Sequence, residues 1–366
     1  MGNLPTTFYS FPDSYTNSNK RRFTYDILDR IFVNLAPPAS CTVPPERSTR
    51  GRWDFSNSYR DLVAVSMVCS RWRQHVLAYG DLWASITIPN QYHPHLRTNG
   101  DEPWWTWAEV LMQRSGKAPL FVCLDLQYVG DARHCQVIRD CLPRIKGFCI
   151  HGSGLFDSPI LDVLKGTRAP QLEALSLDLM DAERLVGCDF QPGELFCNNT
   201  PRLKQLTVKP GIAVLPSVPA LERLTNFTVL HRGNERTQMP TNRCYDLHEE
   251  LCSMTSLEVL EIETDSRNML DWEGRQKIQF RHLRKIDIKD SLHNCRQILA
   301  KIVVPAGCTA EIVVSHERDV DMDELARYWI KWMGIGYVNG RVPGAEIDKT
   351  REGQVLRMTV PSAFDL

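Results

Sequence analysis

The sequence predicts a protein of mixed helix and strand, α+β to α/β, in which a small helical domain comes first and a region of irregular stacked repeats follows. Two observations lead to this prediction. Apolar residues recur at helical spacing in two segments before residue 80. A short apolar pattern typical of strands recurs between about residues 140 and 290. The composition, 43% hydrophobic and 24% charged, is that of an average soluble protein and fits a chain with its own buried core.

The charge balance and the cysteines limit the classes of function. The 366 residues include 43 Lys and Arg against 44 Asp and Glu, so the chain lacks the basic excess that nucleic-acid binding needs. No apolar run approaches the roughly 20 residues that span a bilayer, and residues 1–18 lack the apolar stretch of a secretory signal. The 12 cysteines are scattered without a C-x-x-C pair, which favours free thiols in a reducing compartment, cytoplasmic and/or nuclear.

Residues 1–21 are expected to be flexible, and residues 22–88 to form the helical domain. A first helix is predicted at 26–35, with Thr24 as its N-cap, because apolar residues there fall on one face at helical spacing. The segment 37–58 begins with two prolines, is rich in Pro, Ser and Arg, and is predicted to be an inserted loop.

A second helix is predicted at 61–78, followed by a short anchor at 81–86. One apolar stripe runs along this helix and consists of Leu62, Val65, Cys69, Trp72 and Val76. Three further apolar residues, Val63, Met67 and Val68, fall off the stripe. The helix is therefore apolar on more than one side, which indicates either a central place in a bundle or a second face that meets a partner.

Residues 89–139 are predicted to connect the helical domain to the repeats. A helix is expected at 104–114, closed by Ser115-Gly116, and an alternating apolar run at 120–126 is typical of a strand. Trp104, Trp105 and Trp107 near the start of this helix could form an aromatic platform for a ligand, but packing is the favoured interpretation.

From residue 140 to about 320 the chain carries an irregular repeat of the form apolar-x-x-apolar-x-apolar. The repeat begins at Ile145, Leu172, Leu203, Leu224, Leu257 and Leu283, at intervals of 21 to 33 residues. The leucine-rich repeat has such a strand segment and a period of roughly 20–29 residues, so the region is predicted to be leucine-rich-repeat-like, a solenoid of stacked units. The alternative is a set of ordinary strands in an α/β domain.

The last segment, 321–366, is predicted to be a terminal cap made of a helix and a hairpin. Asp321 and Glu324 have the spacing of a capping box before an apolar stripe that ends at Trp332. Asn339-Gly340 indicates a tight turn, and 355–360 could form a last strand.

No motif for catalysis or metal binding emerges. The chain has no H-E-x-x-H, no G-x-x-x-x-G-K-[ST] and no G-x-S-x-G sequence. His151-Gly152-Ser153-Gly154 is interpreted as a turn, and the pair His93 and His95 lacks a third ligand nearby. We therefore expect neither an enzyme nor a cofactor or metal site, and no nucleic-acid or membrane partner.

Three N-terminal segments, taken in order, form a pattern that is typical of a known family. Ile27-Leu28-x-x-Ile31-Phe32 is followed by Val68-Cys69-Ser70-Arg71-Trp72-Arg73 and then by Leu82-Trp83. This order resembles the F-box family over residues 22–88. The segment Gln113-Arg114-Ser115-Gly116-Lys117-Ala118-Pro119-Leu120 is similar to one that follows the F-box in mushroom-type fungal members, which continue into irregular leucine-rich repeats.

The resemblance implies a function in protein recognition. The chain would be the substrate-recognition subunit of an SCF-type (Skp–cullin–F-box) E3 ubiquitin ligase, binding the Skp adaptor and, through it, a cullin–RING ligase. By matching position, the adaptor-binding residues would be Ile27, Leu28, Ile31, Phe32, Val68, Cys69, Trp72, Leu82 and Trp83. Some of these must instead hold the helices together.

The repeat region would capture a target protein, whose identity the sequence does not give. Candidate positions between the apolar strand residues are Glu173, Glu258, Glu261 and Arg284. The alternative function is a leucine-rich scaffold or interaction protein that recruits no ligase. A hydrolase is disfavoured because its motifs are missing.

Overall fold

The structure is a computed structural model of the chain. It describes residues 25–35, 59–88, 103–125, 132–152, 159–179, 195–208, 218–230, 247–263, 272, 274–305, 307–314, 345–350 and 353–359. The predicted loop at 37–58, the predicted helix after residue 321 and the turn at Asn339-Gly340 lie outside these residues.

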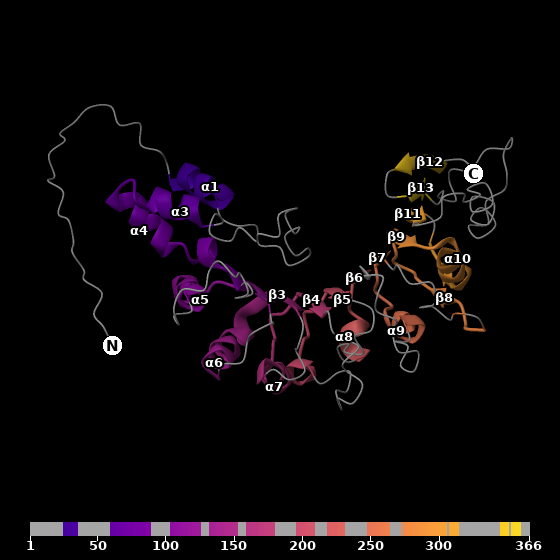
Figure 1. The fold of residues 1–366 in the computed structure, drawn as a ribbon, viewed down its shortest axis with the longest axis horizontal. Coiled ribbons are helices and arrows are strands. Elements are labelled where there is room, and N and C mark those ends of the chain that lie inside the picture. Colours follow the sequence, from indigo (N-terminus) through magenta and orange to yellow (C-terminus); the bar gives the residue numbers. More distant parts are fainter. Residues whose placement is uncertain are drawn as a thin grey trace.

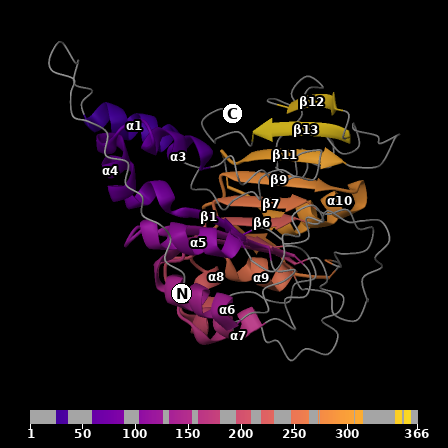
Figure 2. The same ribbon diagram turned by 60° about the vertical axis from the view of Figure 1, so that its left-hand side comes forward.

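One eleven-stranded sheet organises the fold. Its order is β1-β2-β3-β4-β5-β6-β7-β9-β11-β13-β12, so nearly every strand lies beside its neighbour in sequence. The strands are β1 (Ser85–Ile88), β2 (Leu120–Asp125), β3 (Ile145–Gly152), β4 (Ala174–Leu179), β5 (Gln205–Val208), β6 (Asn226–Leu230), β7 (Val259–Glu263), β9 (Lys285–Asp290), β11 (Thr309–Val314), β12 (Ala345–Thr350) and β13 (Gly353–Thr359). The nine strands from β1 to β11 are parallel, and β13 and β12 close the sheet in antiparallel pairing (Figure 2). A small parallel pair, β8 (Ile278–Gln279) and β10 (Ile302–Val303), lies outside this sheet.

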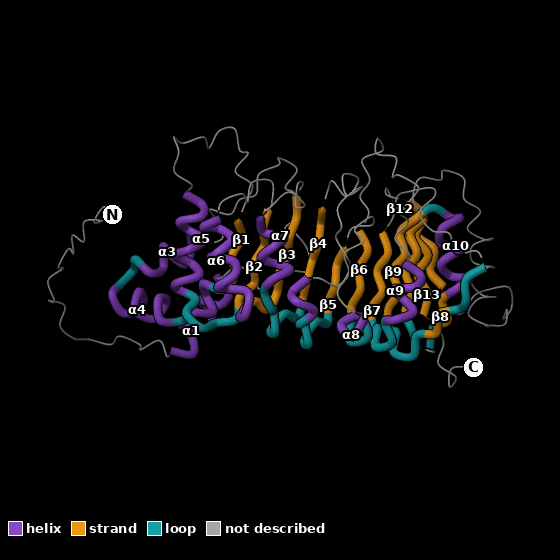
Figure 3. The backbone as a smooth tube through the Cα atoms, turned by 90° about the horizontal axis from the view of Figure 1, so that it is seen from below, coloured by secondary structure: helices purple, strands orange, loops and turns teal. Residues whose placement is uncertain are grey.

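The helices that connect the parallel strands lie on one face of the sheet (Figures 1 and 3). Crossovers between parallel strands are right-handed, so strands added one after another in the same direction place their connecting helices on the same side. The helical segments are α1 (Tyr25–Leu35), α3 (Arg60–Ser66), α4 (Ser70–Ala78), η1 (Gly80–Trp83), α5 (Pro103–Arg114), α6 (Ala132–Cys141), η3 (Leu142–Arg144), α7 (Pro159–Gly166), η6 (Leu195–Asn198), α8 (Val218–Leu221), α9 (Leu247–Ser253) and α10 (Leu292–Lys301). Of these, α1, α3 and α4 lie beyond β1 at one end of the molecule (Figure 3).

The core lies between the sheet and the connecting helices. Successive strand residues point to opposite faces, so every second residue of each strand enters this core. One in-register row of buried side chains crosses all nine parallel strands and consists of Ile86, Val122, Phe148, Leu175, Leu206, Phe227, Leu260, Ile286 and Ala310. Burying each large side chain of this row contributes roughly 1.5–3 kcal/mol.

The predicted fold class, a small helical F-box followed by a leucine-rich-repeat-like solenoid, was wrong. The structure has an α/β fold with one large, mainly parallel sheet. Ile86 of β1 continues the same buried row as Val122 and Phe148, so the sheet begins directly after the N-terminal helices. Helices as long as α5 occupy the crossovers, as in α/β folds. The repeated apolar pattern is common to stacked repeats and to parallel strands covered on one face, and the sequence did not distinguish them.

Most individual elements agree with their predictions. The first helix, the helix before Ser115 and the strand that starts at Leu120 all form, as α1, α5 and β2. The apolar triplets after residue 145 fall in or beside β3 to β9 and are buried. The predicted last strand corresponds to β13.

The predicted helix at 61–78 is instead two helices, α3 and α4, with a turn between them. Cys69 is in an extended conformation and caps α4, since its Sγ accepts a hydrogen bond from the Trp72 backbone N–H at 3.4 Å. The Ser66 hydroxyl donates to the Val63 carbonyl at 2.6 Å, and Arg73 Nε donates to the Ser66 carbonyl at 3.2 Å across the turn. A Ser, Thr, Asn or Asp is the usual N-cap, so Cys69 did not signal this break.

Aromatic packing joins the N-terminal helices to the sheet. Trp83 is fully buried, donates from Nε1 to the Val76 carbonyl at 2.8 Å and stacks on Tyr59 with ring centroids 5.8 Å apart. The Tyr59 hydroxyl donates to the carbonyl of Ser85 on β1, and burial raises the pKa of this tyrosine. Arg114 of α5 covers the Trp83 ring at 4.7 Å, so three elements meet at one indole.

A close backbone approach fixes the same junction. A Cβ at Gly80 would lie 2.5 Å from the Ser115 carbonyl oxygen, at the end of α5, so only glycine fits there without movement. The oxygen is held in place because it accepts a hydrogen bond from the Ala118 N–H at 2.9 Å. Arg144 also clamps this helix end by donating to the Met112 carbonyl at 2.8 Å and to the Ser115 hydroxyl at 2.9 Å.

A Leu→Ala substitution in the buried row should lower the free energy of unfolding much more than the same substitution at an exposed position. Leu260→Ala should lower the free energy of unfolding by about 2–5 kcal/mol, because it leaves a cavity in the centre of the row. Leu77→Ala, at a side chain that is 41% exposed on α4, should change it by about 0.5 kcal/mol or less. Urea unfolding followed by tryptophan fluorescence measures both, and equal destabilisation would contradict the packing described here.

Candidate functional site

The structure divides the predicted adaptor-binding residues into buried and exposed groups. Phe32, Leu82 and Trp83 are buried, and Trp72 is partly buried. Ile31, Val68 and Cys69 are exposed. Ile27 and Leu28 belong to α1, but their side chains lie outside the described residues.

The buried members hold the N-terminal helices together. Phe32 of α1 meets Trp72 of α4 edge-to-face with ring centroids 5.6 Å apart, and it also contacts the His75 ring at 5.6 Å. Leu82 and Trp83 fix the start of the sheet below these helices. These residues are therefore structural, and any partner would contact the side chains that they leave outside.

Large apolar side chains are exposed mainly on these N-terminal helices. Seven large hydrophobic residues of the described chain are exposed, and only Val303 lies elsewhere. The other six, which we call the exposed apolar set, are Ile31, Val33, Met67, Val68, Leu77 and Tyr79. Scattered exposed apolar residues are ordinary on protein surfaces, but the concentration of six of them on α1, on the turn between α3 and α4 and at the end of α4 makes this region the candidate functional site.

The most exposed members lie at the turn between α3 and α4. Met67 and Val68 are 69% and 62% exposed. The Cys69 cap and the Arg73 hydrogen bond stabilise this turn, so the two side chains project from a hydrogen-bonded turn. Both residues were off the apolar stripe of the predicted helix, which was the signal that identified them.

Three members of the exposed apolar set were missed in the sequence. Val33 follows the buried Phe32 by one residue, so helical spacing places it away from the core-facing side of α1. Leu77 and Tyr79 flank the end of α4, one on each side of Ala78. An apolar residue outside the core-facing stripe was the available signal for each of them.

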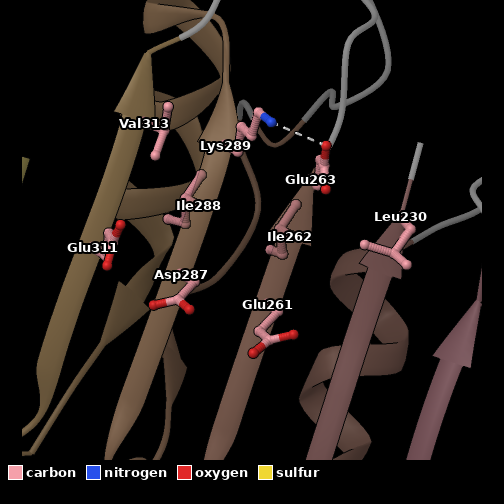
Figure 4. Close-up of a pocket in the computed structure, with 9 residues that line it drawn as sticks. All are labelled: Leu230, Glu261, Ile262, Glu263, Asp287, Ile288, Lys289, Glu311 and Val313. Carbon is pink, nitrogen blue, oxygen red and sulfur yellow. Dashed lines mark ion pairs between the residues drawn. The ribbon is translucent and has the colours of Figure 1, made fainter. Parts of the chain in front are cut away.

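A second surface is the face of the sheet opposite the connecting helices. A hollow of about 260 Å³ lies on this face over β6, β7, β9 and β11 (Figure 4). Of the four target-facing candidates from the sequence, only Glu261 lines it. Glu258 and Arg284 form an ion pair at 3.7 Å, and Glu173 pairs with Lys146 at 3.3 Å.

The described residues do not support an aromatic ligand platform, a metal site or a membrane-spanning helix. Trp105 is buried with its ring 4.1 Å from that of His134, and Trp107 packs edge-to-face on Tyr59, so these indoles are packing residues. In the described part of the chain, no group of three or more His, Cys, Asp or Glu side chains could hold a metal ion. Nor does any helix in that part have the length and hydropathy needed to cross a bilayer.

Nine of the cysteines lie in the described residues, and all nine are free thiols. Cys69, Cys197 and Cys252 are exposed, whereas Cys135, Cys141, Cys149, Cys295 and Cys308 are buried. Burial raises the pKa of Cys308 to about 11 and raises the pKa of Cys141, where Arg144 partly opposes the effect.

No family model matches the chain, and no curated protein matches it in sequence. What the protein does must therefore be inferred from its own residues and their geometry.

The exposure and the pKa of the thiols predict the order in which they react with an alkylating reagent. At pH 8, iodoacetamide should modify Cys69 long before Cys308, because Cys308 is enclosed and only about one part in a thousand of it would be thiolate at that pH. Raising the pH towards 11 increases the Cys308 thiolate, so its rate should keep rising after that of an ordinary thiol has levelled off. Peptide mass spectrometry assigns each site, and equal rates at pH 8 would show that Cys308 is open to solvent.

Proposed function

We propose that the chain is the substrate-recognition subunit of an SCF-type ubiquitin ligase and binds the Skp adaptor through its N-terminal helices. The observation that carries the proposal is the exposed apolar set on α1, on the turn between α3 and α4 and at the end of α4, which holds six of the seven exposed large hydrophobic residues of the described chain. The F-box resemblance supplies the identity of the partner, because the segments that carry the motif are the segments that display these side chains.

The energetics are of the right order for a protein interface. Each exposed apolar side chain can contribute up to about 1.5–3 kcal/mol when a partner buries it. The six side chains are 37–69% exposed, so a partner would bury about half of each, and together they reach the lower half of the roughly 4–15 kcal/mol of freedom lost on association. Without a partner the same surface would favour aggregation, which is a further reason to expect that another protein covers it.

Within this proposal the motif residues have two different roles. Phe32, Trp72 and Trp83 fix the packing of the helices, and their aromatic contacts are internal. Ile31 and Val68 contact the adaptor directly, together with Met67. Truncating a residue of the first group would weaken adaptor binding by disturbing the helices, whereas truncating one of the second would weaken it without disturbing them.

The arrangement also suits a receptor that brings two proteins together. The N-terminal helices lie at one end of the molecule, and the face of the sheet without connecting helices lies along the arc of strands (Figure 1). A subunit of this kind performs no chemistry itself and acts by raising the effective concentration of a target near the ligase.

The central test is a charge introduced at the exposed turn. The double variant Met67→Asp/Val68→Asp should lose Skp-adaptor binding by at least about thirtyfold, since one interface anchor is commonly worth about 2 kcal/mol. Binding of the purified chain to a Skp adaptor is measured by calorimetry. The matched control is Val303→Asp, which places the same charge at an exposed apolar residue far along the chain.

Two outcomes distinguish the proposal from its alternative. Adaptor binding by the double variant that equals the wild type, with an unchanged thermal unfolding midpoint, would refute docking at this turn. If the chain binds no adaptor but retains another stable partner through the same turn, the non-ligase scaffold would be supported instead.

A further inference from the structure

A thiol and an imidazole lie side by side on α9. Cys252 follows His248 by four residues, so helical spacing places both on the same side of this helix. Cys252 Sγ lies 3.8 Å from His248 Nδ1, within hydrogen-bonding reach of a sulfur atom. The helix is one of those that cover the sheet, and it lies away from the N-terminal helices (Figure 1).

A backbone carbonyl determines which nitrogen of His248 carries the proton. His248 Nε2 lies 2.7 Å from the carbonyl oxygen of Gln276. A carbonyl can only accept a hydrogen bond, so Nε2 must donate an N–H to it, and in the neutral ring Nδ1 is then the acceptor. His248 therefore presents a nitrogen lone pair to the Cys252 thiol.

The surroundings hold the imidazole in this orientation. His248 is only 5% exposed, and the ring of Trp272 meets it edge-to-face with ring centroids 5.5 Å apart. Cys252, in contrast, is exposed. A nucleophile within reach of a base that a third group orients is the arrangement that activates a cysteine. Here that arrangement combines an accessible thiol with a buried, fixed base.

Among the described residues, the other two exposed thiols have no such base. Cys197 Sγ donates to the Lys165 carbonyl at 3.1 Å, which keeps the proton on the sulfur. Cys69 Sγ accepts the Trp72 N–H and caps α4. Cys252 is thus the exposed thiol that can pass its proton to an imidazole.

The charges around the pair are of both signs. Glu249 and Glu250 precede Cys252 on α9, and their carboxylates would oppose a thiolate. Glu249 pairs with Arg275 at 3.6 Å, and Lys301 Nζ donates to the Arg275 carbonyl at 2.8 Å. The two cations offset this negative charge.

We propose that Cys252 is a site of reversible modification by small-molecule disulfides, with His248 as its base. His248 Nδ1 takes the thiol proton, and the Cys252 thiolate attacks one sulfur of the disulfide. A new S–S bond forms to Cys252 while the S–S bond of the small molecule breaks, and the departing thiolate takes the proton from the imidazolium. The products are a mixed disulfide on Cys252 and one free thiol. This modification does not depend on adaptor binding.

The test treats the full-length chain with glutathione disulfide at pH 7 and follows each cysteine by peptide mass spectrometry. An ordinary thiol is only a few per cent thiolate at this pH, so transfer of the proton to His248 can raise the rate by about tenfold. Cys252 should therefore react about tenfold or more faster than Cys197, which is also exposed. Dithiothreitol should remove the adduct.

His248→Gln should abolish this advantage, because an amide can still donate to the Gln276 carbonyl but cannot take the thiol proton. The rate at Cys252 should fall by about tenfold, to that of Cys197. The matched control is His293→Gln on α10, where an exposed histidine also has a hydrogen-bond partner four residues away. This control should leave the rate at Cys252 unchanged.

A measurement on the wild type alone covers the case in which His248→Gln does not fold. At about pH 9.5 most of an ordinary thiol is thiolate, so the help of a base no longer matters. The ratio of the Cys252 rate to the Cys197 rate should then fall towards one. A difference in accessibility would persist at the higher pH.

Three results would overturn the inference. The first is an equal rate at Cys252 and Cys197 at pH 7. The second is a rate ratio that stays the same at about pH 9.5, which would mean that accessibility alone favours Cys252. The third is an unchanged Cys252 rate in the folded His248→Gln variant.

Discussion

The structure depends on the in-register pairing of nine parallel strands. Because each strand joins the sheet beside its predecessor, the apolar residues at matching positions form unbroken buried rows from β1 to β11. The same order, together with right-handed crossovers, assigns the connecting helices to one face. The residues between the buried ones must then face the other side, which on β7 and β9 carries the charged side chains of Glu261, Glu263, Lys285, Asp287 and Lys289. The hollow is thus a direct result of the sheet order.

The N-terminal helices and the hollow on the sheet differ in physical character. The N-terminal helices expose apolar side chains, which suit a partner that removes them from water. The hollow is lined by carboxylates that are paired with Lys285 and Lys289.

Local elements could be predicted from the sequence much better than their arrangement. Helical spacing identified α1 and α5, and the residues of the apolar triplets are buried as expected. The fold class was wrong because the pattern around Leu260 or Ile286 reports one buried face and says nothing about how strands are connected. The motif gave Ile31 and Val68 together with Phe32 and Trp83, although only the first two are exposed, since burial depends on the packing between helices. The hollow could not be foreseen, because Glu261, Asp287 and Glu311 are far apart in sequence and meet only through strand register.

The close contact between Gly80 and the Ser115 carbonyl affects how the N-terminal helices are oriented. One additional methyl group there would act as a wedge between the N-terminal helices and the end of α5. A side chain at Gly80 would push the backbone there away from the end of α5. A small shift at this point becomes larger further along the chain, so α1 and α4 would tilt while the strands kept their register. The position of the N-terminal helices relative to the sheet therefore depends on Gly80 as well as on the packing around Trp83.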